Sequence, residues 1–394
     1  MIKMKNYNFD GSISLEVMNN YLDRTLTHMM FGDGDVSRPF ETRLASGIRM
    51  IKKTGAKYIQ RALCPWPPTI QEEQRYPQMK AVMDELHEFD ADIIFEACIF
   101  EIVGTSVNNI PIPAFVFEAF GLQPEQRNFN LDAMLFDYDL YRNQWGSGAH
   151  VPDITKKEAQ MFFYYRACRL IDTGFEALHL GQTGLIGKFD VANRWWSEVI
   201  YLIRDYAAKH ARRHYVVLNS HWSMHNFVGT DGRTLQDFNA YPCRVFACAD
   251  ETDHEVSEEN PQRCDLIPGR LCAPYGMNKC GVTPSGQYVE HYPYLLEYDN
   301  WGGKTGDTTR AVNQWGYDEI SWYANQPKWY RHEFHKNAVA QIKAYCDNGH
   351  FAAAGCRCAY VNGKMDTYYA DMKVDNPLGL DDEDFIRDFW ASEE

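Results

Sequence analysis

Two carboxylates close an apolar run in the stretch YLLEYDNWGG, residues 294–303. Because side chains alternate between the two faces of a strand, Glu297 and Asp299 are expected to share a face with Leu295, next to Trp301. Burying a carboxylate without a purpose is expensive, which favours a functional role for Glu297 over a purely structural one. Paired carboxylates are the groups that hydrolyse glycosidic bonds through an oxocarbenium-like transition state.

The elements that must position these residues alternate between strand-like and helix-like patterns. Helical segments such as 190–213 separate most of the strand-like runs, which is typical of a parallel sheet with helical crossovers. Eight such strands predict an α/β fold, a (β/α)₈ TIM barrel with long βα loops. An open doubly wound sheet is the alternative, but no glycine-rich phosphate turn joins a strand to a helix. The predicted strands are 56–66, 91–104, 175–184, 214–223, 242–251, 270–276, 292–300 and 350–360.

Length and composition fit one barrel domain. The chain has 394 residues, of which 45% are hydrophobic, so a large core is available and we expect a single domain over 1–394. Residues 105–153 are predicted to be a long loop or insertion that serves binding. Residues 377–394 are predicted to be an acidic C-terminal tail with a short helix.

The helix that follows this insertion has predictable ends. Thr155 is placed as its N-cap, with Glu158 at the capping-box position. Gly174 is placed at its C-terminus, because glycine adopts the left-handed conformation that ends many helices.

Charge and cysteine usage limit the function and the location. A formal net charge of −15 argues against a nucleic-acid groove and against an anionic membrane surface. No apolar run reaches the length of about 18 residues that a membrane helix needs. An odd count of 11 Cys and the absence of a leader before MIKMKNYNFDG predict reduced thiols in a cytoplasmic protein, although a chain trimmed of its signal would look the same.

Polar side chains recur near the C-terminal ends of the predicted strands, where barrel enzymes carry their chemistry. Each has a structural alternative: Arg61 and Glu101 as an ion pair between adjacent strands, His179 as a core histidine between leucines, and Asp250 as part of a solvated acidic loop. The coincidence of these residues indicates a site more strongly than any one of them does. They are Arg61, Glu101, His179, Asn219, His221, Asp250, Glu251, Glu297 and Arg357.

Glu297 and Glu101 are the predicted catalytic carboxylates of a glycoside hydrolase, because their strands lie far apart around the barrel rim and can face each other across a substrate. Asp299 or Asp250 could substitute for Glu101, although Asp299 lies so close to Glu297 along the chain that binding a pair of hydroxyls suits it better. A separation of about 5–5.5 Å implies retention and about 6.5–9.5 Å implies inversion. The expected ligand is a small carbohydrate or oligosaccharide, which suits an aromatic content of 14%. The predicted substrate contacts are Asp299, Asn300, Trp301, His179, Gln182, Asn219, His221, Arg61, Arg357 and Trp315.

Two alternatives stay open. His179, His221, Asp250 and Glu297 are ligand types that a divalent cation accepts in barrel isomerases and lyases. No H-x-H or H-E-x-x-H spacing supports a metal, so we predict no cofactor. The other alternative is a barrel that binds a sugar without turning it over.

The stretch WGYDEISWYANQP, residues 315–327, has two interpretations. Its aromatic residues could line a sugar subsite, with Asp318 and Glu319 bonded to hydroxyl groups. Alternatively, the two acids begin a helix, where they favour the macrodipole, and the aromatics belong to the core. The structural interpretation is slightly favoured.

The two stretches quoted above, 294–303 and 315–327, and four further motifs of the chain resemble a family of uncharacterised bacterial proteins. That family has a predicted (β/α)₈ domain that is loosely similar to glycoside hydrolases. The resemblance covers about 90–360 and implies the fold, but no activity. It departs at Phe246-Ala247-Cys248-Ala249, where the family pattern is polar. It also implies importance for Glu101, His179, Gln182, Glu297, Asp299 and Asn300. The motifs are ACIFEIV, RNFNLDAML, FYYRACRLIDTGFEALHLGQ, GVTPSG, PYLLEYDNWG and WGYDEISWYANQP.

Overall fold

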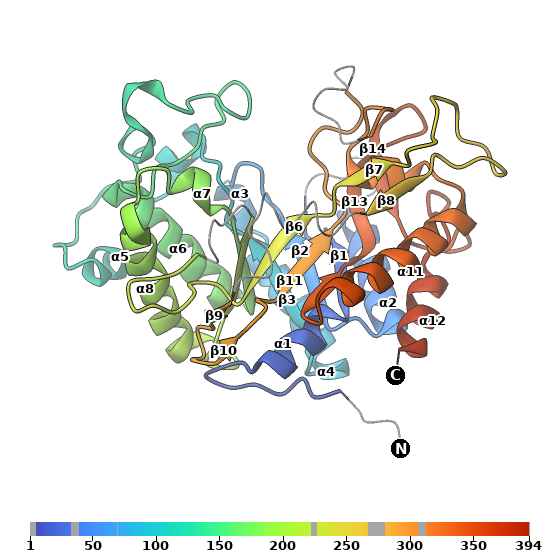
Figure 1. The fold of residues 1–394 in the computed structure, drawn as a ribbon. Coiled ribbons are helices and arrows are strands. Elements are labelled where there is room, and N and C mark those ends of the chain that lie inside the picture. Colours follow the sequence, from blue (N-terminus) through green and yellow to red (C-terminus); the bar gives the residue numbers. More distant parts are fainter. Residues whose placement is uncertain are drawn as a thin grey trace.

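A parallel β-barrel forms the centre of the protein (Figure 1). The computed structural model describes residues 5–32, 39–68, 70–221, 227–266, 280–305 and 313–393. The predicted (β/α)₈ barrel is confirmed. In ladder order its strands are β1 (Thr25–His28), β2 (Tyr58–Leu63), β3 (Ile94–Cys98), β4 (Ala177–Gln182), β5 (Val217–His221), β6 (Phe238–Pro242), β11 (Tyr294–Glu297), and then β12 (Gly349–Phe351) with β13 (Ala353–Val361).

The barrel closes at the position that β12 and β13 share. β12 pairs in parallel with β11, and β13, which a single residue separates from β12, pairs in parallel with β1. β14 (Lys364–Tyr369) pairs with β13 in antiparallel fashion and extends the sheet beyond the barrel. The ladder therefore has ten strands, of which β12 and β13 together make the eighth barrel position.

Helices surround the barrel wherever a long amphipathic segment connects two strands. α2, α4, α6 and α8 follow β1, β2, β3 and β4, and α11 follows β11. These helices bury apolar side chains against the outer face of the sheet, as a barrel crossover must. The principal helices are α2 (Phe40–Thr54), α4 (Tyr76–Phe89), α6 (Lys157–Thr173), α8 (Arg194–His210), α11 (Lys328–Tyr345) and α12 (Glu383–Ser392), and the short ones are α3 (Ile70–Glu73), α5 (Ala114–Ala119), α7 (Thr183–Ile186) and α10 (Glu319–Ala324).

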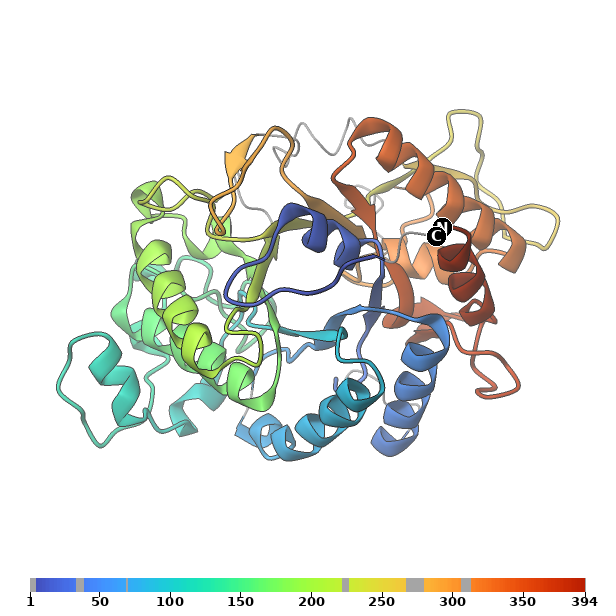
Figure 2. The same ribbon diagram turned by 90° about the horizontal axis from the view of Figure 1, so that it is seen from below.

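The helix α1 (Leu15–Leu22) covers the N-terminal end of the barrel, as the view from below shows (Figure 2). Ser14 begins it, because its hydroxyl accepts a hydrogen bond from the backbone N–H of Val17. The buried face of α1 packs on the lowest inward-facing side chains, including Tyr58 and Leu295. We call the opposite end, where the barrel strands terminate, the barrel mouth.

One predicted strand is wrong, and one strand of the barrel was not predicted. The predicted strand over 242–251 is displaced: the barrel strand is β6, which ends at Pro242, and β7 (Val245–Ala247) pairs instead with β8 (Cys264–Leu266) outside the barrel. The sequence also gave no signal for β1, because its four residues are too few to establish a pattern. The predicted strand over 270–276 lies outside the described residues, and β6 pairs directly with β11. A further hairpin joins β9 (Gly281–Val282) to β10 (Tyr288–Val289).

The long connection between β3 and α6 contains α5 and several short 3₁₀ turns. Glu158 anchors this loop, since its carboxylate accepts hydrogen bonds from Arg127 Nη1 at 2.7 Å and from the backbone N–H of Asn130 at 2.8 Å. The predicted capping box at Thr155 is therefore wrong, because α6 starts after Lys156 without a side-chain cap. Gly174 does end α6, with φ of 114°.

Candidate active site at the barrel mouth

Glu297 is the last residue of β11, and its side chain is fully buried. Arg61, which lies on β2, donates from Nε to Glu297 Oε2 at 3.2 Å and from Nη2 to Oε1. Two parallel hydrogen bonds of this kind fix the orientation of both groups. Leu295 also faces into the barrel, while Leu296 packs in the outer core, so the predicted alternation along β11 is confirmed.

His221, the last residue of β5, shares an oxygen of Glu297 with Arg61. Its Nε2 lies 2.8 Å from Glu297 Oε1 and 2.8 Å from Arg61 Nη2. A guanidinium group only donates, and the carboxylate oxygen is the strongest acceptor present. We therefore place a proton on His221 Nε2, so that Oε1 accepts from both neighbours. The His221 side chain is 16% exposed and borders the mouth.

A second guanidinium group reaches the same carboxylate. Arg357 Nη2 lies 3.8 Å from Glu297 Oε2 and donates to Asp299 Oδ1 at 3.1 Å. Burial alone would raise the pKa of Glu297, but the charges of Arg61 and Arg357, with the hydrogen bond from His221, hold it well below its usual range. Glu297 is therefore an ionised carboxylate. We call Glu297, Arg61, His221, Arg357 and Asp299 the Glu297 cluster.

A second polar network lies inside the barrel beside this cluster. Asn219 Nδ2 donates to Glu96 Oε2 at 2.6 Å, so its Oδ1 is the atom that faces His179 Nδ1 at 2.7 Å. Tyr58 donates to the same Glu96 oxygen at 2.7 Å. His179 must then donate from Nδ1, which leaves Nε2 with a lone pair. This Nε2 is buried and has no hydrogen-bond partner among the described residues.

Two titratable groups of this network are shifted by their surroundings. Burial lowers the pKa of His179 well below its ordinary value, and the positive charge of Arg61 lowers it further. Burial raises the pKa of Glu96, although Arg61 opposes the shift. His179 is therefore a neutral acceptor rather than a cation, and it is a fixed acceptor because Asn219 holds its ring.

A local irregularity of β2 aims Arg61 into the barrel. The pairing register with β3 shifts between Ile59 and Leu63, and Arg61 has φ of 59°, in the left-handed region. Its backbone N–H donates to Glu96 Oε1 at 3.1 Å, which stabilises this uncommon conformation. A bulge re-aims a side chain in this way at many functional sites.

Glu101 belongs to a separate unit, three residues beyond the end of β3. Gln182 Nε2 donates to Glu101 Oε1 at 2.8 Å, and the backbone N–H of Gln182 donates to Oε2 at 3.0 Å. Gly181 makes the contact possible, because a Cβ at this residue would lie 2.1 Å from Glu101 Oε2. These two partners of Glu101 are uncharged amides, in contrast to the guanidinium partners of Glu297. The alternative in which Arg61 pairs with Glu101 is wrong, since within the described chain Arg61 pairs with Glu297 and Glu96.

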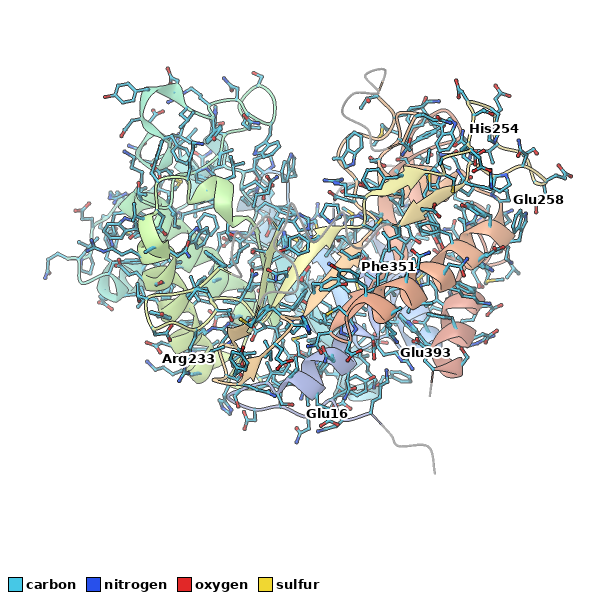
Figure 3. The ribbon with its side chains drawn as sticks, in the orientation of Figure 1. Glu16, Arg233, His254, Glu258, Phe351 and Glu393 are labelled. Atoms are coloured by element: carbon cyan, nitrogen blue, oxygen red, sulfur yellow. The ribbon has the colours of Figure 1, made fainter. Side chains whose placement is uncertain are left out.

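Two acids of the predicted ring lie elsewhere. Asp250 and Glu251 occupy the loop between β7 and β8, where Arg263 lies 2.9 Å from Asp250 and 3.2 Å from Glu251. The same loop carries His254 and Glu258 on the outer side of the molecule (Figure 3). The prediction that these acids belong to the mouth fails, because the barrel strand ends before this loop begins.

For the stretch 315–327 the structural interpretation is correct, in which its acids begin a helix and its aromatic residues belong to the core. Asp318 is the N-cap of α10, with its carboxylate accepting from the backbone N–H of Ser321 at 2.9 Å, and burial raises its pKa to about 6. Trp315 is only 6% exposed and packs in the core, so the structure does not bring it to the cluster.

Trp301 and Asn300 lie next to the Glu297 cluster and bond to different acids, of which Asp299 belongs to the cluster and Glu319 does not. Trp301 Nε1 donates to Glu319 Oε2 at 2.8 Å, and Asn300 donates its backbone N–H to Asp299 Oδ1 at 2.8 Å. Glu319 also accepts from Arg244 Nη1 at 2.5 Å. Burial raises the pKa of Glu319 to about 7, although Arg244 opposes the shift.

Sequence reasoning missed Glu96 and Tyr58. Both are fully buried, and both orient the Asn219 side chain. A signal for Glu96 was present, because a carboxylate stands in the middle of the apolar stretch ADIIFEACIF. Glu96 and Cys98 are two residues apart on β3, so their side chains share the inward face of the strand, where Arg61 contacts Cys98.

The described residues offer neither a metal site nor a membrane span. They contain no group of three or more His, Cys, Asp or Glu side chains arranged to hold a metal ion. No helix among them is both long enough and apolar enough to cross a membrane.

Solved structures with similar folds are glycoside hydrolases of several families. A GH113 β-1,4-mannanase aligns over 93% of this chain and 97% of its own, at 12% identity and a TM-score of 0.43. The protein AmyP in complex with maltose aligns over 96% of this chain and 80% of its own, at 12% identity and a TM-score of 0.49. A GH31 dextranase from Flavobacterium johnsoniae, complexed with glucose, aligns over 95% and 41%, at 12% identity and 0.42.

These similarities assign neither a substrate nor a catalytic residue to this chain, because the identities are low and the TM-scores lie under 0.5. No protein-family model and no curated protein matches the sequence. The resemblance to an uncharacterised bacterial family therefore stays a prediction.

Proposed function

We propose that this protein is a carbohydrate-active enzyme, a glycoside hydrolase whose catalytic carboxylates are Glu297 and Glu101. The observation that carries the proposal is the contrast between their environments. Glu297 is kept ionised by Arg61 and Arg357, whereas Glu101 is held by the neutral amide groups of Gln182. A glycoside hydrolase uses two carboxyl groups in different roles, one as a base or nucleophile and the other as a proton donor.

In this proposal Glu297 stabilises or attacks the developing positive charge at the anomeric carbon. Its carboxylate is oriented before substrate arrives, because Arg61 and His221 hold it from two sides. Such preorganisation avoids rearranging dipoles during the reaction. Glu101 donates a proton to the leaving oxygen, with Gln182 fixing the carboxyl group.

The remaining predicted contacts take roles in sugar binding. The Nε2 of His179 accepts a hydrogen bond from a sugar hydroxyl, since its lone pair has no partner among the described residues. Like Glu297, His179 has no exposed surface, so a substrate must displace part of its surroundings to reach it. Asp299, whose side chain is 18% exposed and bonded to Arg357, accepts from another hydroxyl. This reaction requires no metal ion, so treatment with a chelator should leave the rate unchanged. A fall to the background rate, reversed by adding a divalent cation, would favour the metal-dependent isomerase or lyase.

A binding protein without turnover is the second candidate, and one observation favours it. Glu297 has no exposed surface, so a substrate must displace part of its surroundings to reach it. The two candidates differ in turnover: a hydrolase releases reducing sugar from its glycan, and a binding protein retains the glycan intact.

The test is a panel of soluble mannan, starch and dextran together with aryl glycosides that carry a good leaving group. Glu101→Gln should lose about 10²–10⁴-fold in rate on the natural glycan, as expected for a missing general acid. It should lose far less on the aryl glycoside, whose leaving group needs no proton. Glu85→Gln is the matched control, because this carboxylate lies on α4 and is 51% exposed. Equal losses of rate on both substrates would contradict the role of Glu101 as the acid. The absence of turnover by the wild type on every substrate would favour the binding protein over the hydrolase.

A further inference from the structure

Trp66 is a half-exposed tryptophan beside the candidate active site. It lies three residues beyond the end of β2, and 49% of its surface is exposed. A large apolar ring gains most when it leaves water, so an exposed tryptophan next to a polar site offers a surface for a ligand.

Two further aromatic rings hold Trp66 in place. Its ring centroid lies 5.1 Å from that of Phe100 and 5.7 Å from that of Trp145, at interplanar angles of 73° and 64°. Trp145 is fixed in turn, because its Nε1 donates to the backbone oxygen of Glu101 at 3.0 Å. The three rings come from the segment after β2, the segment after β3 and the long insertion, so the fold assembles them at one place. We call them the Trp66 platform.

The platform adjoins both parts of the site. The Phe100 ring lies 5.6 Å from the ring of His179, and the guanidinium of Arg61 lies 5.9 Å from the Phe100 centroid. Trp145 bonds to the main chain of Glu101, the proposed proton donor. A ligand group on Trp66 would therefore lie near the Glu101 unit, and the Phe100 ring would separate it from Arg61 of the Glu297 cluster.

We infer that the Trp66 platform is a subsite that stacks on the pyranose ring of a sugar unit next to the bond that is cleaved. This inference rests on the proposed function. A sugar ring presents C–H groups on its face and hydroxyls at its rim, so it matches a flat apolar ring bordered by polar side chains. Glu101 and Gln182 supply those polar groups, and the net charge of −15 disfavours a phosphorylated ligand instead.

Affinity electrophoresis in native gels that contain soluble mannan, starch or dextran tests the inference. Trp66→Ala should raise the apparent dissociation constant for the retarding polysaccharide at least fivefold, and Trp66→Phe should keep most of the affinity. Trp329→Ala is the matched control, because Trp329 is 44% exposed on α11 and bonds to the main chain of Glu258, away from the mouth. Thermal unfolding of each variant verifies that it is folded.

The outcomes separate the inference from the proposed function. Equal retardation of the wild type and Trp66→Ala would overturn the subsite and leave the hydrolase intact. Trp66-dependent retardation without release of reducing sugar would support the subsite and overturn the hydrolase. If none of the three polysaccharides retards the wild type, the subsite is overturned, and the parallel turnover assay alone decides the fate of the hydrolase.

Discussion

Arg61 on β2 and Glu297 on β11 form a buried ion pair across the barrel mouth, with two hydrogen bonds between guanidinium and carboxylate. The two strands are not neighbours in the sheet. The pair therefore ties opposite parts of the barrel together while it orients the proposed catalytic carboxylate.

Replacing Arg61 with Met should destabilise the fold by about 3–5 kcal/mol, because it leaves a buried carboxylate short of its main partner. Urea unfolding measures the change. Lys80→Met is the control, since Lys80 and Asp84 form an exposed pair, with side chains 52% and 56% exposed, and its loss should cost under about 1 kcal/mol. The double variant Arg61→Met, Glu297→Met should be more stable than Arg61→Met alone. A double variant less stable than the single one would contradict the buried pair.

Glu319 should make stability fall as the pH rises. Its pKa is 4.5 in the ordinary state and about 7 in the folded protein, so the folded chain holds a proton that the unfolded chain releases. The stability from this raised pKa is fully present below about pH 4.5 and is lost as the pH rises through about 7. Glu319→Gln stays neutral, so its free energy of unfolding should rise relative to wild type between pH 5 and 8. Parallel pH profiles of the two proteins would show that the carboxyl is not shifted.

Cys64 and Cys98 should cross-link on mild oxidation. Their Sγ atoms lie 3.3 Å apart, and they follow the paired residues Leu63 and Ala97 of β2 and β3. Diamide accepts the two hydrogens as the sulfur–sulfur bond forms, so mass spectrometry after proteolysis should find the two peptides joined, with a loss of about 2 Da. Cys64→Ser removes this product. Cross-linking of other cysteines but not of this pair would contradict the register of β2 and β3.

Gly181→Ala should displace Glu101, since the new Cβ would lie 2.1 Å from Glu101 Oε2. Gly181 also has φ of 74°, so part of any loss comes from backbone strain. Gly232→Ala separates the two causes, because Gly232 has φ of 82° but open space around its Cβ position. Both variants should lose about 1 kcal/mol or more of stability, and only Gly181→Ala should lose turnover. Equal turnover in the two variants would show that the reaction does not depend on the position of Glu101.

The barrel was predictable because its signals are local. Alternating strand and helix patterns predicted the architecture. The two-residue period of a strand predicted that Glu297 and Leu295 share the inner face, as the structure shows. Gly174 ended its helix as expected, since the left-handed conformation is a property of the residue itself.

The errors come from contacts between distant parts of the chain. β1 is a strand because β2 and β13 flank it, not because its four residues form a pattern. Glu158 had the spacing of a capping box, but Arg127 in the insertion takes its carboxylate. The hydrogen bond between Arg61 and Glu96 likewise depends on a bulge in β2, which the sequence alone does not reveal.

The most direct test of the central claim is the turnover number of Glu297→Gln on a glycan that the wild type cleaves, measured together with its affinity and its unfolding free energy. The amide keeps the shape of the carboxylate but removes the charge that Arg61 and Arg357 hold in place. We predict a loss of more than about 10³-fold in kcat, on the natural glycan and on an aryl glycoside alike, in a protein that is folded and still binds the glycan. A kcat within a few-fold of the wild-type value would contradict the assignment of Glu297 as the catalytic carboxylate.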